Sequence, residues 1–187
     1  MHAIAVGIPS VEVYTNLVAV NAELWEVFQL SGVSLATSWY SSDPGQHQRI
    51  VHRDTHAKTL ANISRALELG IPIRVGLTDI YPEQNVEEAL EQIRALGIKD
   101  AGIEPVTPVG RAAHGRETSR GDLCGRCTRR LVILPDGDVH PCVMASWPEM
   151  RAGNIRESSL RELLTGEPLA AIRRTLQAEF DGRPARS

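Results

Sequence analysis

Hydrophobic positions follow two alternating periodicities along the first 106 residues. Short runs rich in β-branched and aromatic residues predict strands, and these runs cover residues 11–18, 33–40, 71–80 and 100–106. Between them, apolar residues recur at helical spacing behind polar N-cap residues, which are Asn21, Thr55 and Asn85. Glu88 stands three residues after Asn85, the spacing of a capping box. The segment 41–54 has neither periodicity and is interpreted as a polar loop.

Regular alternation of strand and helix predicts parallel β/α units joined by right-handed crossovers. Four strands are too few for a complete eight-stranded barrel. The expected fold class is therefore α/β, with a partial parallel β/α (TIM-like) barrel. Such a partial sheet leaves parallel strand edges uncovered, which favours self-association.

The rhythm breaks at about residue 107. A connector rich in Gly and Arg precedes two apolar runs, 129–134 and 139–144, which are separated by the turn sequence Pro-Asp-Gly. This pattern predicts a hairpin, and apolar spacing after residue 159 predicts a helical tail. We expect residues 1–110 to form the partial barrel and residues 111–187 to form a small α+β hairpin domain.

Composition narrows the choice of partners. The sequence has no run of about 18 apolar residues, the length that marks a membrane span, and its start lacks the basic and apolar regions of a signal peptide. A net charge of −3 gives no general attraction to nucleic acid. The expectation is a cytoplasmic protein that binds neither membrane nor nucleic acid, with its oligomeric state left open. Six arginines in residues 111–130 form either a solvated connector or a cationic collar.

All three cysteines fall within the hairpin region, at Cys124, Cys127 and Cys142. Folding at the Pro-Asp-Gly turn returns Cys142 toward the C-x2-C pair, so three thiolates can converge on one metal centre. Clustered cysteines in a reducing compartment more often indicate metal ligation than disulfides. The spacing alone does not distinguish zinc from an iron–sulfur cluster. His140 shares a strand face with Cys142 and is the candidate fourth ligand.

The hairpin resembles a known extension. Nine residues separate Cys127 from Gly137 and four separate Gly137 from Cys142. Together with "ILPDGDVHPC" and "AGNIRESSLRELL", this spacing resembles the SPASM/twitch extensions of radical S-adenosylmethionine (SAM) enzymes. The resemblance implies an auxiliary [4Fe–4S] cluster on the three cysteines, in the one-cluster twitch form. It favours an open fourth iron site, with His140 or a thiolate from outside this chain as the alternatives.

The β/α half resembles the same enzymes, with residues 11–18, 33–40 and 71–80 matching their third, fourth and fifth barrel strands. By this resemblance, the residues that approach SAM are Thr15, Asn16, Ser38 and Arg74. The alternative is ordinary strand polarity at these positions. The resemblance also implies a peptide or small-molecule natural-product precursor as substrate.

One departure from the family affects activity. The SAM-cleaving cluster of radical SAM enzymes needs a C-x3-C-x2-C loop, and no cysteine precedes Cys124. We therefore expect the C-terminal part of such an enzyme, which uses SAM only when complete and generates no radical alone. The alternative is a non-catalytic module, stapled by zinc or a cluster, that binds a peptide or partner protein.

Two further groups of residues have simple interpretations. Histidines at 47, 52 and 56 suit a metal by residue type, but their placement around a loop favours solvated or capping roles. The aromatic residues expected in the core are Tyr14, Trp25, Phe28 and Trp39.

Overall fold

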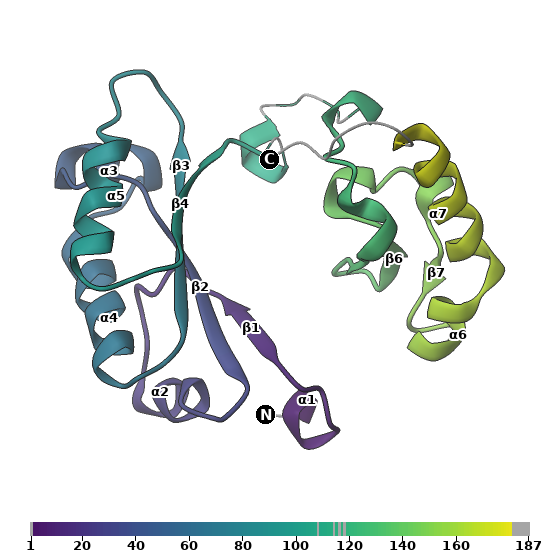
Figure 1. Cartoon of the computed structure of the whole chain (residues 1–187), viewed down its shortest axis with the longest axis horizontal. Helices are drawn as coiled ribbons and strands as arrows, with labels where there is room; N and C mark the ends of the chain where they lie inside the picture. The colour runs from purple at the N-terminus through teal and green to yellow at the C-terminus, as the bar shows by residue number, and fades with distance from the viewer. Residues whose placement is uncertain (1, 108, 114, 116, 118, 181–187) are drawn as a thin grey trace. The chain divides into compact units, whose positions relative to one another are not determined.

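The computed structural model describes residues 2–180 except 108, 114, 116 and 118 (Figure 1). The chain divides into two compact units, Met1–Val106 and Thr107–Ser187.

The first unit contains a fully parallel sheet with the strand order β1-β2-β3-β4. Its strands are β1 (Val11–Tyr14), β2 (Val33–Trp39), β3 (Ile73–Asp79) and β4 (Ala101–Pro105). Its helices are α1 (His2–Ala5), α2 (Ala22–Phe28), α3 (Pro44–Val51), α4 (His56–Glu68) and α5 (Val86–Ala95). Sequential parallel strands with intervening helices confirm the α/β fold class and its partial-barrel character. The sheet leaves β1 and β4 as its two edges.

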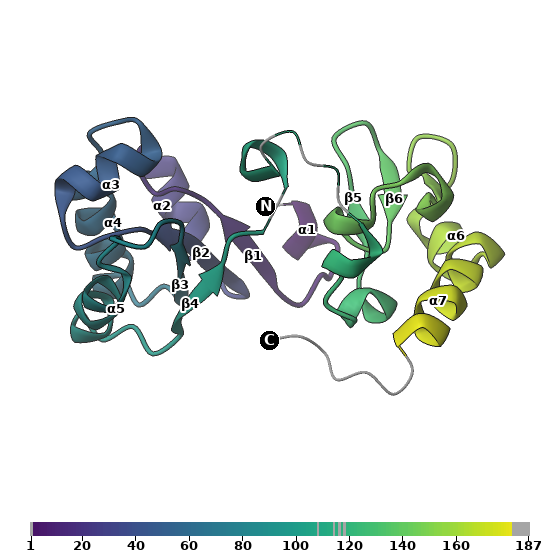
Figure 2. The ribbon, with the colours of Figure 1, turned by 90° about the horizontal axis from the view of Figure 1, so that it is seen from above.

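The helices α4 and α5 lie on one side of this sheet (Figures 1 and 2), and the core forms there. Alternate residues of β2 and β3 point into that core, among them the fully buried Leu35, Trp39 and Leu77. The opposite face is open, and Tyr14 on it is 72% exposed. The expectation of a core position for Tyr14 was therefore wrong, whereas Trp39 and Phe28 are buried as expected.

Local signals in the first unit predicted its helix starts only in part. Asn21 caps α2 by accepting a hydrogen bond from the Leu24 backbone N–H at 2.9 Å. Thr55 stands before α4 without a capping hydrogen bond, and Asn85 likewise makes none to α5. The predicted polar loop contains α3, which Asp43 caps at the Gln46 backbone N–H, 2.7 Å away. Asp followed by Pro at the first helical position was the signal for this helix.

The first strand is shorter than the predicted 11–18. Thr15 Oγ1 accepts a hydrogen bond from the Leu17 backbone N–H at 3.1 Å, and Leu17 has a φ of 52°. A left-handed backbone at this position turns the chain out of the sheet, and the Leu17 side chain is fully buried. The β-branched composition of the segment gave no sign of this turn.

The second unit is built on a small antiparallel sheet with the order β5-β6-β7. Its strands are β5 (Val132–Ile133), β6 (Asp138–His140) and β7 (Gly153–Asn154), and its α-helices are α6 (Leu160–Thr165) and α7 (Glu167–Phe180). The predicted hairpin and helical tail are thus present, with strands far shorter than the apolar runs suggested. The strand β7 was not predicted.

The core of this unit gathers Leu123, Cys127 and Val139 against apolar residues of α7, namely Leu169, Ile172 and Leu176. Spacings of three and four residues place those helical residues on one face. Among the described residues, no helix combines the length and the apolar character that crossing a membrane requires.

Candidate functional site

The cysteines lie on two short, irregular segments of the second unit. Cys124 stands between two 3-10 turns, η2 (Arg120–Asp122) and η3 (Arg126–Arg129), and Cys127 is part of η3. Gly125 between them has a φ of 79°, a conformation that suits glycine and lets the chain curl tightly. Cys142 immediately precedes the turn η4 (Val143–Ala145). All three cysteines are free thiols rather than disulfides.

Cys127 and Cys142 meet directly, as the hairpin predicted. The Cys127 thiol donates a hydrogen bond to Cys142 Sγ, and the Met144 backbone N–H donates to the same sulfur at 3.2 Å. These donors, together with the nearby Arg130 charge, lower the pKa of Cys142. Donation to Cys142 and burial raise the pKa of Cys127, which is 2% exposed. The pair therefore gives up its first proton readily, from Cys142, and its second with difficulty.

Cys124 lies near the other two cysteines but is not part of their direct contact. It is near enough to Cys127 to raise the pKa of that thiol by electrostatic repulsion. Yet the part of the chain that the structure describes contains no ready group of three His, Cys, Asp or Glu side chains placed to hold a metal ion. The fold thus brings two of the three predicted ligands into contact. A centre held by all three requires Cys124 to close on the Cys127–Cys142 pair.

His140 is buried at 3% exposure, and its Nδ1 atom has no hydrogen-bond partner among the described residues. Buried ring nitrogens almost always have a partner, so the orphaned atom marks a place where another group fits. The donor set also suits an iron–sulfur cluster, because thiolates are its usual ligands and one thiol here ionises readily. The residues present therefore fit the group that the sequence resemblance implies.

The described arginine side chains of residues 111–130 have separate partners. Arg120 forms an ion pair with Glu179 at 3.0 Å, and Arg130 contributes charge beside Cys142. Arg116 and the side chains of Arg111, Arg126 and Arg129 lie outside the described part of the chain. Of the two interpretations of this segment, the structure supports a cationic contribution at Arg130.

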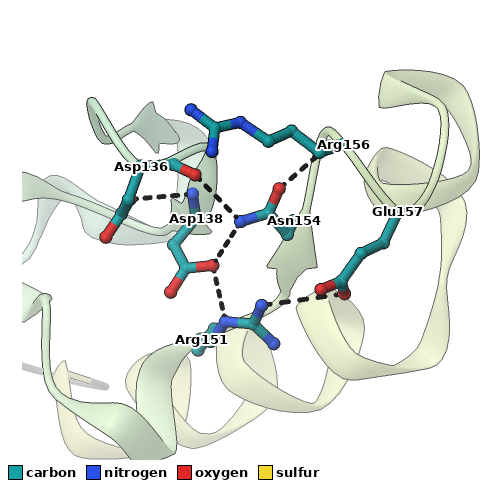
Figure 3. A network of polar contacts seen from close by, with 6 residues as sticks. All are labelled: Asp136, Asp138, Arg151, Asn154, Arg156 and Glu157. Carbon is teal, nitrogen blue, oxygen red and sulfur yellow. Dashed lines mark hydrogen bonds and ion pairs between the residues drawn. The ribbon is translucent and has the colours of Figure 1, made fainter.

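A polar network fixes the hairpin that carries Cys142 (Figure 3). Asn154 of β7 donates to Asp138 Oδ1 at 2.7 Å and to the Asp136 carbonyl at 3.2 Å, and its Oδ1 accepts from the Arg156 backbone N–H at 2.8 Å. Arg151 pairs with Asp138 at 2.7 Å. One side chain thus ties the turn of the hairpin to the third strand. The Asn of the sequence run "AGNIRESSLRELL" was the available signal, although its structural role was not predicted.

The four predicted SAM contacts take different positions. Ser38 and Arg74 lie on the open face of the sheet, where Arg74 makes a two-pronged ion pair with Glu12, at 2.7 and 3.1 Å, and also contacts Tyr14. The side-chain oxygens of Thr15 and Asn16 accept hydrogen bonds from the backbone two residues further along. Arg74 and Ser38 thus share a surface, whereas Thr15 and Asn16 shape the loop after β1.

A buried cluster of two histidines around Trp39 of β2 was not predicted from the sequence. His47 and His56 both pack against the Trp39 ring, with ring centroids 4.9 and 4.6 Å from it, and are 2% and 9% exposed. His47 Nε2 lies 3.2 Å from Thr55 Oγ1, and His56 Nε2 lies 3.1 Å from the Ser42 carbonyl. Solvated or capping roles were therefore wrong for these two residues, because helices α3 and α4 turn them inward.

Comparison with known proteins identifies the second unit. Residues 124–185 match the SPASM family of iron–sulfur cluster-binding domains. No curated protein sequence matches the chain.

Solved structures share the fold of nearly the whole chain at low sequence identity. A structure of hexahistidine-tagged anSMEcpe with bound AdoMet is 12% identical, with a TM-score of 0.64, and the match covers 88% of this chain and 59% of that one. Native anSMEcpe with bound AdoMet and Cp18Cys peptide gives a TM-score of 0.62 at 12% identity, over 88% and 60%. Streptococcus suis SuiB bound to S-adenosylmethionine gives 0.65 at 12% identity, over 86% and 48%.

This chain therefore spans about half to three-fifths of the length of these structures. Both anSMEcpe and SuiB are radical SAM enzymes, and the resemblance noted in the sequence is confirmed. Residues 124–185 thus match the SPASM family of iron–sulfur cluster-binding domains, and most of the chain shares the fold of these two radical SAM enzymes.

Proposed function

We propose that Cys124, Cys127 and Cys142 hold an auxiliary [4Fe–4S] cluster in a radical SAM enzyme that modifies a peptide or natural-product precursor. The observation that carries this proposal is the Cys127–Cys142 contact inside a segment that matches a cluster-binding family. One of the similar structures has both AdoMet and a peptide bound, which supports the substrate class.

The chain prepares the ligand positions in three ways. The Cys127 thiol and the Met144 backbone N–H stabilise Cys142 as a thiolate, so little proton release is needed there before a metal binds. Leu123 and Cys127 are almost fully buried, which keeps water from one side of the site. The Arg130 charge offsets part of the negative charge that three thiolates bring. When bound, the cluster supplies a reducible iron centre that takes up an electron or holds substrate.

We propose that SAM in the complete enzyme is contacted by Ser38 and Arg74 on the open face of the sheet and by Thr15 and Asn16 in the loop after β1. The ion pair with Glu12 supports this proposal, because it fixes the position of the Arg74 guanidinium on that face. Ser38→Leu places a bulky side chain there and is expected to weaken SAM binding in equilibrium dialysis. Ser31→Leu, in the exposed turn before β2, is the control and should bind SAM like the parent protein.

Anaerobic reconstitution with iron and sulfide tests the cluster. We expect a brown protein with about four irons and four sulfides per chain, as a [4Fe–4S] cluster requires. Cys142→Ser should abolish the chromophore, because two thiolates are too few to retain the cluster. Uptake of one zinc per chain with no iron would contradict the proposal and indicate a zinc-stapled binding module.

The second arm of this experiment concerns SAM cleavage. No cysteine precedes Cys124, so residues 1–123 contain no ligands for the C-x3-C-x2-C cluster that cleaves SAM in the family. The loaded chain, mixed with SAM and a strong reductant, is expected to give no 5′-deoxyadenosine. Clear turnover by the pure protein would show that this chain cleaves SAM without the C-x3-C-x2-C cluster and would contradict the proposal.

A further inference from the structure

His140 has a buried ring nitrogen without a hydrogen-bond partner among the described residues. It ends strand β6 opposite Val132 of β5 and is 3% exposed. Its Nδ1 atom makes no hydrogen bond within the described part of the chain. A buried polar atom of this kind costs free energy comparable to a lost hydrogen bond, and native proteins rarely leave one unpaired.

His140 lies next to a cysteine of the proposed site in the chain. Cys142, two residues after His140, has an extended backbone with φ of −167° and ψ of 155°. Only Pro141, where the chain bends, separates His140 from Cys142, so the imidazole belongs to the same short segment as this cysteine. The neighbouring Val139 is fully buried in the apolar core of the unit, against which Cys142 also packs.

His140 is nevertheless not placed as a metal ligand. Within the described residues, no three His, Cys, Asp or Glu side chains form a ready metal site, so neither His140 nor the three cysteines form a closed site as they stand. The donors to Cys142 Sγ are the Cys127 thiol and backbone N–H groups, and His140 is not among them. His140 is therefore two residues from a proposed thiolate ligand without donating to its sulfur.

We propose that His140 donates an Nδ1–H hydrogen bond to a sulfur of the cluster held by the cysteines. This inference rests on the proposed function. Nitrogen donors near cluster sulfurs stabilise the reduced, more negatively charged state, and so raise the reduction potential. His140 would thus set how easily the cluster accepts an electron, while the cysteines hold it.

The test compares reconstituted variants by redox titration followed by electron paramagnetic resonance. His140→Phe keeps an aromatic ring and removes the donor, whereas His140→Asn puts an amide N–H close to the Nδ1 position. At the midpoint potential of the parent protein, we expect the reduced-to-oxidised ratio to fall at least tenfold in His140→Phe. For a one-electron couple this is a shift of about 59 mV to more negative potential. His140→Asn should remain close to the parent.

The matched control is His47→Phe. His47 is 2% exposed and its Nδ1 is likewise unpartnered among the described residues, but it belongs to the first unit. The same substitution at an equally buried histidine should leave the potential unchanged. An equal shift in both variants would overturn the inference, because it would report general perturbation rather than a lost donor.

The remaining outcomes separate the two proposals. A parent protein that takes up no iron contradicts the proposed function itself. Full iron loading with an unchanged potential in His140→Phe overturns only the role of His140. If His140→Phe, unlike the parent, binds added imidazole at the cluster, the histidine is an iron ligand and the hydrogen bond is refuted.

Should His140→Phe fail to load iron, the parent labelled with ¹⁵N-histidine decides the question. Electron–nuclear double resonance should then show a weak nitrogen coupling that crosses a hydrogen bond. A coupling of the size of direct coordination, or none at all, would overturn the inference.

Discussion

Gly137 and Asn154 lie so close together that a Cβ atom on Gly137 would stand 2.7 Å from Asn154 Oδ1. Gly137 also has a φ of 94°, a backbone conformation that is strained for any residue with a side chain. Glycine is therefore required twice at this turn, by its backbone conformation and by the space that Asn154 occupies. The contact holds the hairpin whose second strand leads to Cys142.

Gly137→Ala should destabilise the second unit by more than backbone strain alone. The positive φ accounts for about 1–3 kcal/mol, and displacement of the Asn154 amide adds to it. Urea unfolding measures the loss. Gly97→Ala is the control, since Gly97 has a φ of 98° but nothing within 4 Å of its Cβ position. Equal losses at the two positions would show that the Asn154 contact contributes nothing.

Asn154→Asp tests the network of Figure 3. The substitution keeps the oxygen that accepts from the Arg156 backbone N–H and replaces the donor to Asp138 with a second carboxylate. We expect a lower melting temperature at low salt that is partly recovered at high salt, because salt screens the repulsion. Asn16→Asp retains the side-chain oxygen that accepts from the Val18 backbone N–H, so little change is expected there. A salt-independent loss at Asn154 would point to packing instead.

Alkylation of the metal-free protein should modify Cys142 before Cys127 at pH 7. The Cys127 thiol and backbone donors lower the pKa of Cys142 to about 6, so most of it is thiolate at this pH. Iodoacetamide labelling with mass spectrometry gives the order, and the Cys142 rate should fall as the pH drops through 6. In urea all three cysteines should react alike, with the ordinary pKa of about 8.5. Faster labelling of Cys127 would contradict the direction of its hydrogen bond.

The first unit should lose stability in mildly acidic solution because of His47. Burial, and then repulsion from His56, lower the pKa of His47 below its ordinary value of 6.5. The unfolded chain then binds more protons than the folded one as the pH falls below about 6.5. The free energy of unfolding therefore decreases from that pH downward, until folded His47 is itself protonated.

His47→Phe should flatten this decrease when urea unfolding is repeated between pH 7 and 5. The flanking rings of Trp39 and Tyr40 can accommodate an aromatic replacement. His2→Phe, at an exposed position, should leave the pH dependence as it is in the parent protein. The same slope in all three proteins would assign the acid sensitivity to other groups.

Local and periodic features of this protein were readable from its sequence. Alternating strand and helix periods gave the parallel β/α unit, because each element must bury one face against its neighbours. The Pro-Asp-Gly turn was equally local: Asp136 Oδ1 accepts from the Asp138 backbone N–H at 3.0 Å, and Gly137 supplies the positive φ. The spacing left zinc and iron open, and the resemblance of this segment to SPASM/twitch extensions indicated the iron–sulfur family, which the match over 124–185 bears out.

Tertiary structure alone decided which distant groups meet. Arg74 finds Glu12 from 62 residues away because parallel pairing brings β1 and β3 to either side of β2. Two-residue strands such as β7 have no periodicity to detect, so the Asn154 contact with Asp138 was invisible beforehand. The spacing predicted that three thiols could converge. In the folded chain only Cys127 and Cys142 are in contact, because the path of the backbone leaves Cys124 further away. The burial of a ring nitrogen without a hydrogen-bond partner depends on all the groups packed around it. For His140, only the folded chain shows this burial.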